Sequence, residues 1–211
     1  MTSNKENEEN TMKVFQAIEQ RRAVRHYQAG AEMPEQDFQQ LMSAVLLSPT
    51  SYNIQHWRFI RVKDKSQREK IKAAAWGQAQ VSDASELIIL CADINAWRDR
   101  PERYVTNSPK EVQEMLLPMM AAFYEGKEQL QRDETMRSCG MAAQTLMLAA
   151  KGLGYDTCPM IGFDQEALAP LIRLPKGHVI AMMVAIGKAT TPAHPRSGQL
   201  QLKDVLFENY F

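Results

Sequence analysis

Ten residues between a helical pattern and a strand pattern carry side chains suited to contacting a flat, polar ring. The segment Ser48-Pro49-Thr50-Ser51-Tyr52-Asn53-Ile54-Gln55-His56-Trp57 opens with Pro49, which ends the preceding helix. The amides of Asn53 and Gln55 each offer two donors and one acceptor, so together they can match the edge of a planar heterocycle. Ordinary loops contain the same residue types, so the segment alone leaves both interpretations open.

The basic run Arg21-Arg22-Ala23-Val24-Arg25 is a second candidate. If the preceding helix continues through the run, Arg21 and Arg25 are i,i+4 neighbours and their guanidinium groups converge on one patch. Guanidinium groups bind phosphate oxygens bidentately, so the patch suits a phosphate monoester. The alternative is a solvated helix end whose cations complement the helix dipole.

The segment Cys158-Pro159-Met160-Ile161-Gly162-Phe163-Asp164 follows a methionine-rich helical pattern. Pro159 and Gly162 bracket backbone that a ligand ring can approach closely, because glycine has no Cβ. The alternative is a plain connection between two helices. The loop His194-Pro195-Arg196 adds a late cationic point. Phe123 and Tyr124 can stack on an aromatic substrate, although such pairs more often pack in a core.

The remaining chemistry-bearing residues form no catalytic or metal-binding pattern. His56 and His178 have no acidic partner at a recognisable spacing, and the sequence has no His-x-x-x-His pair, Gly-x-Ser-x-Gly motif or phosphate-binding loop. Cys91, Cys139 and Cys158 lie far apart and form no C-x-x-C pair. A dinucleotide-binding G-x-G-x-x-G fingerprint is absent. We therefore expect no catalytic side chain and no metal site.

Composition limits the class of protein. A chain of 211 residues with 45% hydrophobic content can bury the core of one domain. The 25 basic residues balance the 25 acidic residues, which argues against a broad nucleic-acid-binding surface. The longest apolar stretch, residues 179–186, is far shorter than the roughly 20 residues of a membrane-spanning helix. Residues 1–10 are polar and predict a flexible lead-in without a signal peptide, so we expect a cytoplasmic protein.

Hydrophobic periodicity predicts the elements that position these candidates. Thr11 can cap a first helix that runs into the basic run. The other predicted helices cover residues 34–47, 66–80, 109–125, 133–151 and 164–172, and the predicted strands cover 57–62, 87–92 and 178–187, the last as a central strand. The long loop at 93–110 predicts a lid or insertion over 93–130. The apolar tail, 188–211, predicts packing on a second subunit.

The order of these motifs resembles that of the FMN-dependent nitroreductase family. Arg-Arg-x-Val-Arg is followed by the 48–57 segment, then by Cys-Pro-Met-Ile-Gly-Phe-Asp after a long helix, then by Ile-Gly-Lys and a late Pro-Arg. The resemblance spans about residues 15 to 206. It implies an α+β fold with a mainly antiparallel central sheet flanked by helices, in a single domain over 11–211. It also implies an intertwined homodimer that holds FMN at the interface and exchanges the C-terminal segment.

The resemblance assigns the cofactor contacts by position. It implies that the phosphate and the pyrimidine side of the flavin contact Arg21, Arg22, Ala23 and Arg25, and that further phosphate contacts come from His194 and Arg196. It implies ring contacts near N5 from Pro159, Met160, Ile161 and Gly162. Contacts from the other subunit would come from Pro49, Thr50, Ser51, Asn53 and Gln55. The chain departs from the family pattern at Ala23 (usually serine), His56 (usually proline), Ile161 (often Glu or Gly) and His194 (frequently lysine).

The implied function is an oxidoreductase in which FMN carries two electrons from NAD(P)H to a nitroaromatic, quinone or related small-molecule acceptor by a ping-pong mechanism. No side-chain acid or base is required. Phe123, Tyr124 and His56 are the expected substrate contacts. Two alternatives remain: a specialised flavoenzyme of the same fold that catalyses dehalogenation or flavin cleavage, and a non-catalytic module that binds FMN or another anion.

Overall fold

A four-stranded antiparallel sheet forms the centre of the computed structural model, which describes residues 12–211. The predicted Thr11 cap and the predicted lead-in at 1–10 lie outside the described residues. The strand order is β1-β2-β4-β3, with β1 Trp57–Arg61, β2 Glu86–Asp93, β3 Asp156–Met160 and β4 His178–Gly187. All neighbouring strands pair antiparallel, and β4 is central as predicted.

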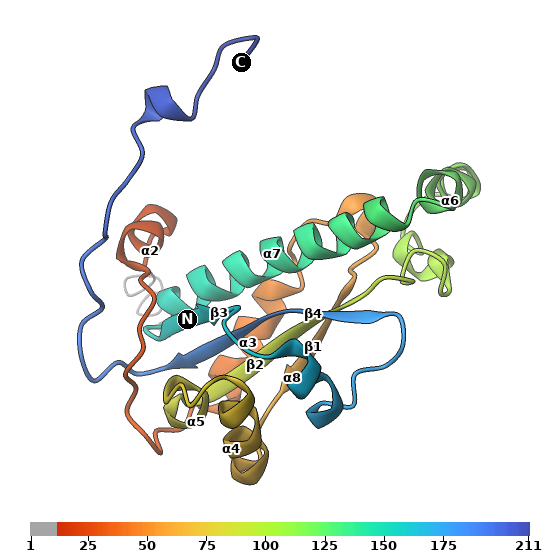
Figure 1. Cartoon of the computed structure of the whole chain (residues 1–211). Helices are drawn as coiled ribbons and strands as arrows, with labels where there is room; N and C mark the ends of the chain where they lie inside the picture. Colours follow the sequence, from red (N-terminus) through yellow and green to blue (C-terminus); the bar gives the residue numbers. More distant parts are fainter. Residues whose placement is uncertain (1–11) are drawn as a thin grey trace, which may run out of the picture.

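Helices cover both faces of this sheet (Figure 1). Helices α3 (Glu35–Val45) and α7 (Glu128–Gly152) pack on one face, and α4 (Lys65–Ala74), α5 (Gln80–Asp83) and α8 (Gln165–Leu171) pack on the other. Successive strand side chains point to opposite faces, so Ile88 and Leu90 of β2 join the first core while Leu87 and Ile89 join the second. These features confirm the predicted α+β fold with a mainly antiparallel sheet flanked by helices.

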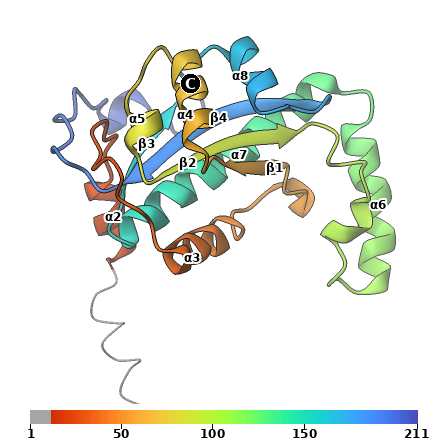
Figure 2. The ribbon, with the colours of Figure 1, turned by 90° about the horizontal axis from the view of Figure 1, so that it is seen from below.

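Different segments of the chain lie near the two ends of α7. Figure 2 shows α2 (Val14–Gln20) near one end and α6 (Lys110–Tyr124) near the other. Beside α6 lie two short 3-10 helices, η1 (Ser51–Asn53) and η2 (Pro101–Tyr104). A third apolar cluster, which includes Ile54, Trp97, Met120 and Tyr124, joins these segments. Within residues 12–211, no helix is long and apolar enough to cross a membrane.

Four predictions of secondary structure were wrong. The first helix ends at Gln20, because Arg21 is extended and Val24 N–H donates to Thr157 O over 3.0 Å. Residues 156–160 form β3 and not a connection, since they pair with β4 at the edge of the sheet, where Pro159 is tolerated. The charged helix predicted over 66–80 is divided between α4 and α5 by a turn. Helix α7 begins at Glu128, five residues before the predicted start.

The C-terminal tail, residues 188–211, leaves the sheet and extends away from the body of the chain (Figure 1). It contains the short 3-10 helix η3 (Leu202–Asp204). Near its start, Thr190 N–H donates to His26 O over 3.0 Å. Further along, Leu202, Phe207 and Phe211 are exposed within residues 12–211, and the rings of Phe207 and Phe211 contact each other.

Candidate cofactor site

The basic run lies beside the edge strand β3. Ala23 pairs with Thr157 in a parallel bridge, and this extended backbone replaces the predicted helix. Val24 is buried in the core, whereas Ala23 and Arg25 are exposed. The predicted i,i+4 relation between Arg21 and Arg25 was therefore wrong, but both residues still lie along one sheet edge.

The arginines of this edge meet the start of the tail. Arg196 Nη2 donates to Glu19 O over 3.2 Å and to Arg21 O over 3.5 Å, and the Arg22 guanidinium donates to His194 O. Burial lowers the pKa of Arg21, and the charges of Arg196 and Arg22 lower it further. The structure thus brings Arg21, Arg22, His194 and Arg196 close together.

Among the described residues, these arginines have no acidic side-chain partner. Within residues 12–211, neither Arg21 nor Arg25 forms an ion pair or a side-chain hydrogen bond, and Arg22 and Arg196 donate only to backbone carbonyls. Clustered like charges repel one another, and a bound anion with several oxygen acceptors would offset that repulsion. The donor set therefore fits a phosphate group.

The predicted ring-binding segment begins inside β3 and lies next to this cluster. Burial raises the pKa of the Cys158 thiol, and the nearby charge of Arg25 opposes that rise, which places Arg25 beside the segment. Met160 is buried, whereas Ile161 is 76% exposed. A Cβ added to Gly162 would stand 3.2 Å from Trp76 Cζ3. The close approach explains why position 162 is occupied by glycine.

Two residues at this segment were missed by the sequence analysis. Trp76 and Gln78 lie in the turn between α4 and α5, and Gln78 Nε2 donates to Gly162 O over 2.7 Å. The available signal was the Trp76-Gly77 pair, because glycine commonly ends a helix. The prediction of one continuous helix over 66–80 concealed it.

The 48–57 segment lies at the other end of the sheet and has a strained backbone. Tyr52, Asn53 and Gln55 have φ values of 50°, 56° and 50°. Gln55 N–H donates to Thr50 Oγ1 over 3.0 Å, and Asn53 Nδ2 donates to Tyr104 O over 3.0 Å. Gln55 Nε2 lies 3.2 Å from Asn53 Oδ1. The two predicted ring-contacting amides therefore bond to each other and to the 94–109 loop, which fixes the shape of the segment.

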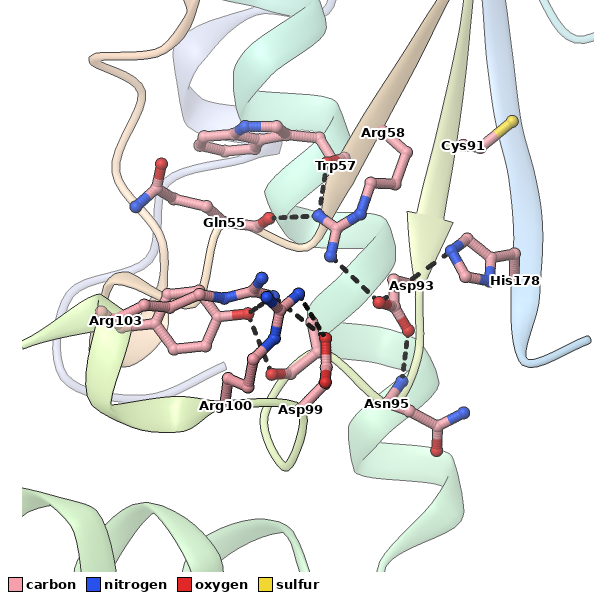
Figure 3. A network of polar contacts seen from close by, with 12 residues as sticks. Gln55, Trp57, Arg58, Cys91, Asp93, Asn95, Asp99, Arg100, Arg103 and His178 are labelled. Carbon is pink, nitrogen blue, oxygen red and sulfur yellow. Dashed lines mark hydrogen bonds and ion pairs between the residues drawn. The ribbon is translucent and has the colours of Figure 1, made fainter. Parts of the chain in front are cut away.

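A polar network holds the end of this segment against the sheet (Figure 3). Arg58 donates to Gln55 O over 3.1 Å and to buried Asp93 Oδ2 over 3.0 Å. Asp93 also accepts from Asn95 N–H over 2.9 Å, and His178 Nε2 lies 3.9 Å from it. His178 thus has an acidic neighbour, contrary to the prediction, because the β2–β4 register pairs residues that are distant in the sequence.

Two of the three expected substrate contacts are fully buried. His56 Nδ1 lies 3.2 Å from Ser138 Oγ, and burial lowers the pKa of His56 to about 4. Tyr124 packs against Trp97 and Phe123, with ring centroids 6.0 and 5.0 Å away. These side chains belong to the core, so the prediction that they contact a substrate was wrong for this conformation. Phe123 is 40% exposed and stays a candidate contact.

Comparison with known proteins identifies the family. The model described as "Nitroreductase family" matches residues 18–188. The chain belongs to the nitroreductase family. The Synechocystis protein DrgA is 50% identical over 182 residues, which cover 86% of this chain and 87% of DrgA. The Bacillus subtilis protein MhqN, whose name is that of an NAD(P)H nitroreductase, is 31% identical over 189 residues, covering 86% of this chain and 91% of MhqN.

A solved structure shows the same fold. A protein from Exiguobacterium sibiricum, crystallised in complex with FMN, superposes with a TM-score of 0.87 at 24% identity and covers 95% of this chain and 99% of that chain. The resemblance predicted from the motif order is therefore confirmed.

In this nitroreductase-family chain the two halves of the predicted site are far apart. Trp57, which ends the 48–57 segment, pairs with Ala92 of β2, and Ala92 pairs with Val179 of β4. Thr157, beside the arginines, pairs with Ile186 of β4. At roughly 3.3 Å per strand residue, Val179 and Ile186 are separated by about 23 Å along β4. One flavin ring is much shorter than this, so the 48–57 segment and the arginines of a single chain do not contact the same ring. The 159–162 segment lies nearer, because Met160 pairs with Met183, about 13 Å from the level of Trp57 along β4.

One cavity, of about 820 Å³, contains none of the predicted contacts. It lies around Arg61, whose guanidinium is 2.6 Å from Glu86 Oε1 and 2.7 Å from Glu35 Oε2. Because that guanidinium is already paired, we favour the arginines beside β3 as the anion site, although they line a surface and not an enclosed cavity.

Proposed function

We propose that this chain is an FMN-dependent oxidoreductase that uses NAD(P)H to reduce a nitroaromatic, quinone or related small-molecule acceptor. The observation that carries the proposal is the group of arginines beside the Pro159–Gly162 backbone, which have no acidic side-chain partner within residues 12–211. The name of MhqN and the FMN in the Exiguobacterium structure support the cofactor and the electron donor. The reaction would be ping-pong, with NAD(P)H leaving before the acceptor binds.

The residues present fit FMN. Arg21 and Arg25 would bind the phosphate, and Arg196 and Arg22 would add charge while they stay bonded to backbone carbonyls. The backbone at Ile161 and Gly162 would approach the ring, because no Cβ stands at position 162. When bound, FMN supplies the acceptance and donation of a hydride equivalent. The protein binds and orients the cofactor and supplies positive charge, so no side-chain acid or base is needed.

The departures from the family pattern change particular contacts. Ala23 has no hydroxyl, so one hydrogen bond to the phosphate or ribityl chain is missing. Ile161 would contact the flavin only through its backbone. The His194 side chain is exposed, and its carbonyl accepts from Arg22, so this residue supports the cluster through its backbone.

We infer that the complete site needs a second copy of the chain. Pro49, Thr50, Ser51, Asn53 and Gln55 of one copy would reach the ring bound by the arginines of the other, which accounts for the separation of about 23 Å along β4. The exposed apolar tail, 188–211, would embrace the partner, and exposed Phe15 of α2 fits the same interface. Residues 93–130 would form the lid. The described cysteines are free and buried, which fits a reducing cytoplasm.

Colour and redox cycling test the proposal. The purified protein, incubated with FMN and desalted, should retain flavin absorption, lose it anaerobically on adding NADH or NADPH, and regain it on adding a quinone. A protein that stays colourless would refute the proposal. A yellow protein that neither nucleotide bleaches would instead be a flavin-binding module, and an acceptor panel that responds only to a halogenated substrate or to flavin itself would indicate a specialised enzyme.

Oligomeric state tests the shared site separately. The full chain should be a dimer by light scattering, and a chain that ends at residue 199 should be monomeric and lose FMN. A monomer that retains FMN as tightly as the full chain would exclude a site built from two copies.

A further inference from the structure

A single exposed tryptophan stands beside the candidate cofactor segment. Trp76 is 71% exposed, whereas the other two tryptophans, Trp57 and Trp97, are only 5% and 8% exposed. An indole contributes to folding mainly through the large apolar area that it buries. Trp76 buries little of that area, so core packing does not explain a tryptophan at this position.

The backbone at Trp76 is also strained. Its φ is 56°, and Gly77 follows with a φ of 75°. The turn is closed by Gly77 N–H, which donates to Lys72 O over 2.9 Å. Glycine adopts the left-handed conformation without cost, but a bulky residue does so rarely, and such strain gathers at functional sites. Glycine or asparagine would fit position 76 better if the turn served only to end α4.

The strained turn fixes the indole next to the ring-binding segment. Gln78 Nε2 donates to Gly162 O over 2.7 Å, and Asp164 N–H donates to Ala74 O over 2.9 Å. These two bonds lie on either side of Trp76 and join the turn to residues 162–164. Trp76 Cζ3 stands 3.2 Å from the place of a Cβ at Gly162, so the indole lies against the backbone there.

An exposed apolar side chain lies near the indole. Ile161, the residue before Gly162, is 76% exposed, and Trp76 forms no ion pair and no side-chain hydrogen bond within residues 12–211. A large, electron-rich aromatic face beside Ile161 suits a flat, electron-poor ring. Stacking would strengthen the binding of planar aromatic acceptors and would not strengthen the binding of a compact inorganic acceptor.

We propose that Trp76 is a specificity-determining residue that forms one wall of the acceptor site and stacks on planar aromatic acceptors such as quinones and nitroaromatics. The proposal rests on the proposed function, because it requires an acceptor beside the Pro159–Gly162 segment. It assigns the preference for aromatic acceptors to this chain's own side chain and not to the cofactor.

Three variants test the role of Trp76. Trp76→Asn removes the indole and tolerates the left-handed backbone, so it keeps the turn; Trp76→Phe retains an aromatic face. Arg173→Asn, the same replacement at another exposed residue with positive φ, is the matched control. With 1,4-naphthoquinone as acceptor, Trp76→Asn should lower kcat/KM about tenfold through KM, as expected for the loss of one stacking contact. Trp76→Phe should recover most of this loss, and ferricyanide reduction should be unchanged in all three variants.

Fluorescence gives a readout that does not depend on turnover. Naphthoquinone added to the oxidised protein without NAD(P)H should quench tryptophan emission saturably in the parent and in Arg173→Asn. The saturable part of the quenching should be lost in Trp76→Asn. Flavin content and thermal unfolding of each variant should match the parent, which separates a specificity effect from loss of cofactor or fold.

The outcomes separate the two proposals. A protein that neither binds FMN nor oxidises NAD(P)H refutes the proposed function. The role of Trp76 alone is overturned by a different result. The parent would bind FMN and oxidise NAD(P)H, while Trp76→Asn would keep the parent's ratio of naphthoquinone to ferricyanide reduction and the saturable quenching. An equal loss for both acceptors would show that Trp76 positions the Gly162 segment and does not select the acceptor, which also overturns the proposal.

Discussion

Replacing Arg21 by alanine tests whether this residue binds the phosphate of FMN and not its ring. Arg21 is half-buried, burial and the charges of Arg196 and Arg22 lower its pKa, and its guanidinium has no partner within residues 12–211. Hydrogen bonds to a charged group contribute about 1.5 to 3 kcal/mol each. At 1.4 kcal/mol per factor of ten, losing one such contact should weaken FMN binding by about 10- to 150-fold.

The lower part of that range is the better expectation. The repulsion between Arg21 and the neighbouring guanidinium groups is present both with and without FMN, so its removal does not add to the loss of binding. Arg22 and Arg196 also stay near the phosphate, because their bonds to His194 O and Glu19 O do not involve the Arg21 side chain. We therefore expect FMN binding to weaken by about tenfold to thirtyfold.

Riboflavin supplies the control, because it has the ring and ribityl chain of FMN without the phosphate. Titrations monitored by flavin fluorescence should show that Arg21→Ala weakens FMN binding and leaves riboflavin binding unchanged. Lys65→Ala, which removes an equal charge from an exposed position on α4, should affect neither ligand. Equal weakening of FMN and riboflavin, or no weakening of FMN, would refute the assignment of Arg21 to the phosphate.

Three further predictions concern stability, each measured by urea unfolding. Burial lowers the folded-state pKa of His56 from 6.5 to about 4, so unfolding takes up a proton below pH 6.5. The contribution of His56 to the free energy of unfolding should be constant above that pH and fall by up to about 3 kcal/mol as the pH drops to 4. The fall should be smaller in His56→Gln. Asp164→Ala should cost about 1 kcal/mol, because Asp164 accepts from Ala167 N–H at the start of α8. Arg61→Met should cost about 3 kcal/mol, because it leaves the buried Glu86 carboxylate unpaired, and a cost near zero would contradict that pairing.

Elements defined by local periodicity were predictable from the sequence. Strand β4 was correct because its uniform apolarity reflects burial on both faces, and Asp164 was identified as a helix cap from its residue type. The end of α2 at Gln20 was not predictable, because it depends on pairing between Val24 and Thr157, which are distant in the sequence. Strand β3 was missed for the same reason, since its five residues are stabilised by β4 and contain Pro159.

The backbone that positions the candidate site was not predictable from local spacing. Arg21 and Arg25 lie along the same sheet edge, but extended pairing with β3 places them there and helical spacing does not. His56 departs from the family pattern, which drew attention to it as a substrate contact, yet sequence alone gives no measure of burial and its side chain is fully buried. Trp76 was missed because its exposure and its contact with Gly162 appear only in three dimensions.

Backbone strain marks both halves of the proposed site independently of the family resemblance. Within residues 12–211 seven non-glycine residues have positive φ, and four of them are Tyr52, Asn53, Gln55 and Trp76. Three lie in the 48–57 segment, and the fourth lies against Gly162. A fold accepts such conformations only where surrounding contacts impose them, and here Tyr104 O and the Gln78 side chain supply those contacts. The 48–57 segment and the arginines beside β3 lie at different ends of one sheet, so a single FMN contacts both only if each comes from a different copy of the chain.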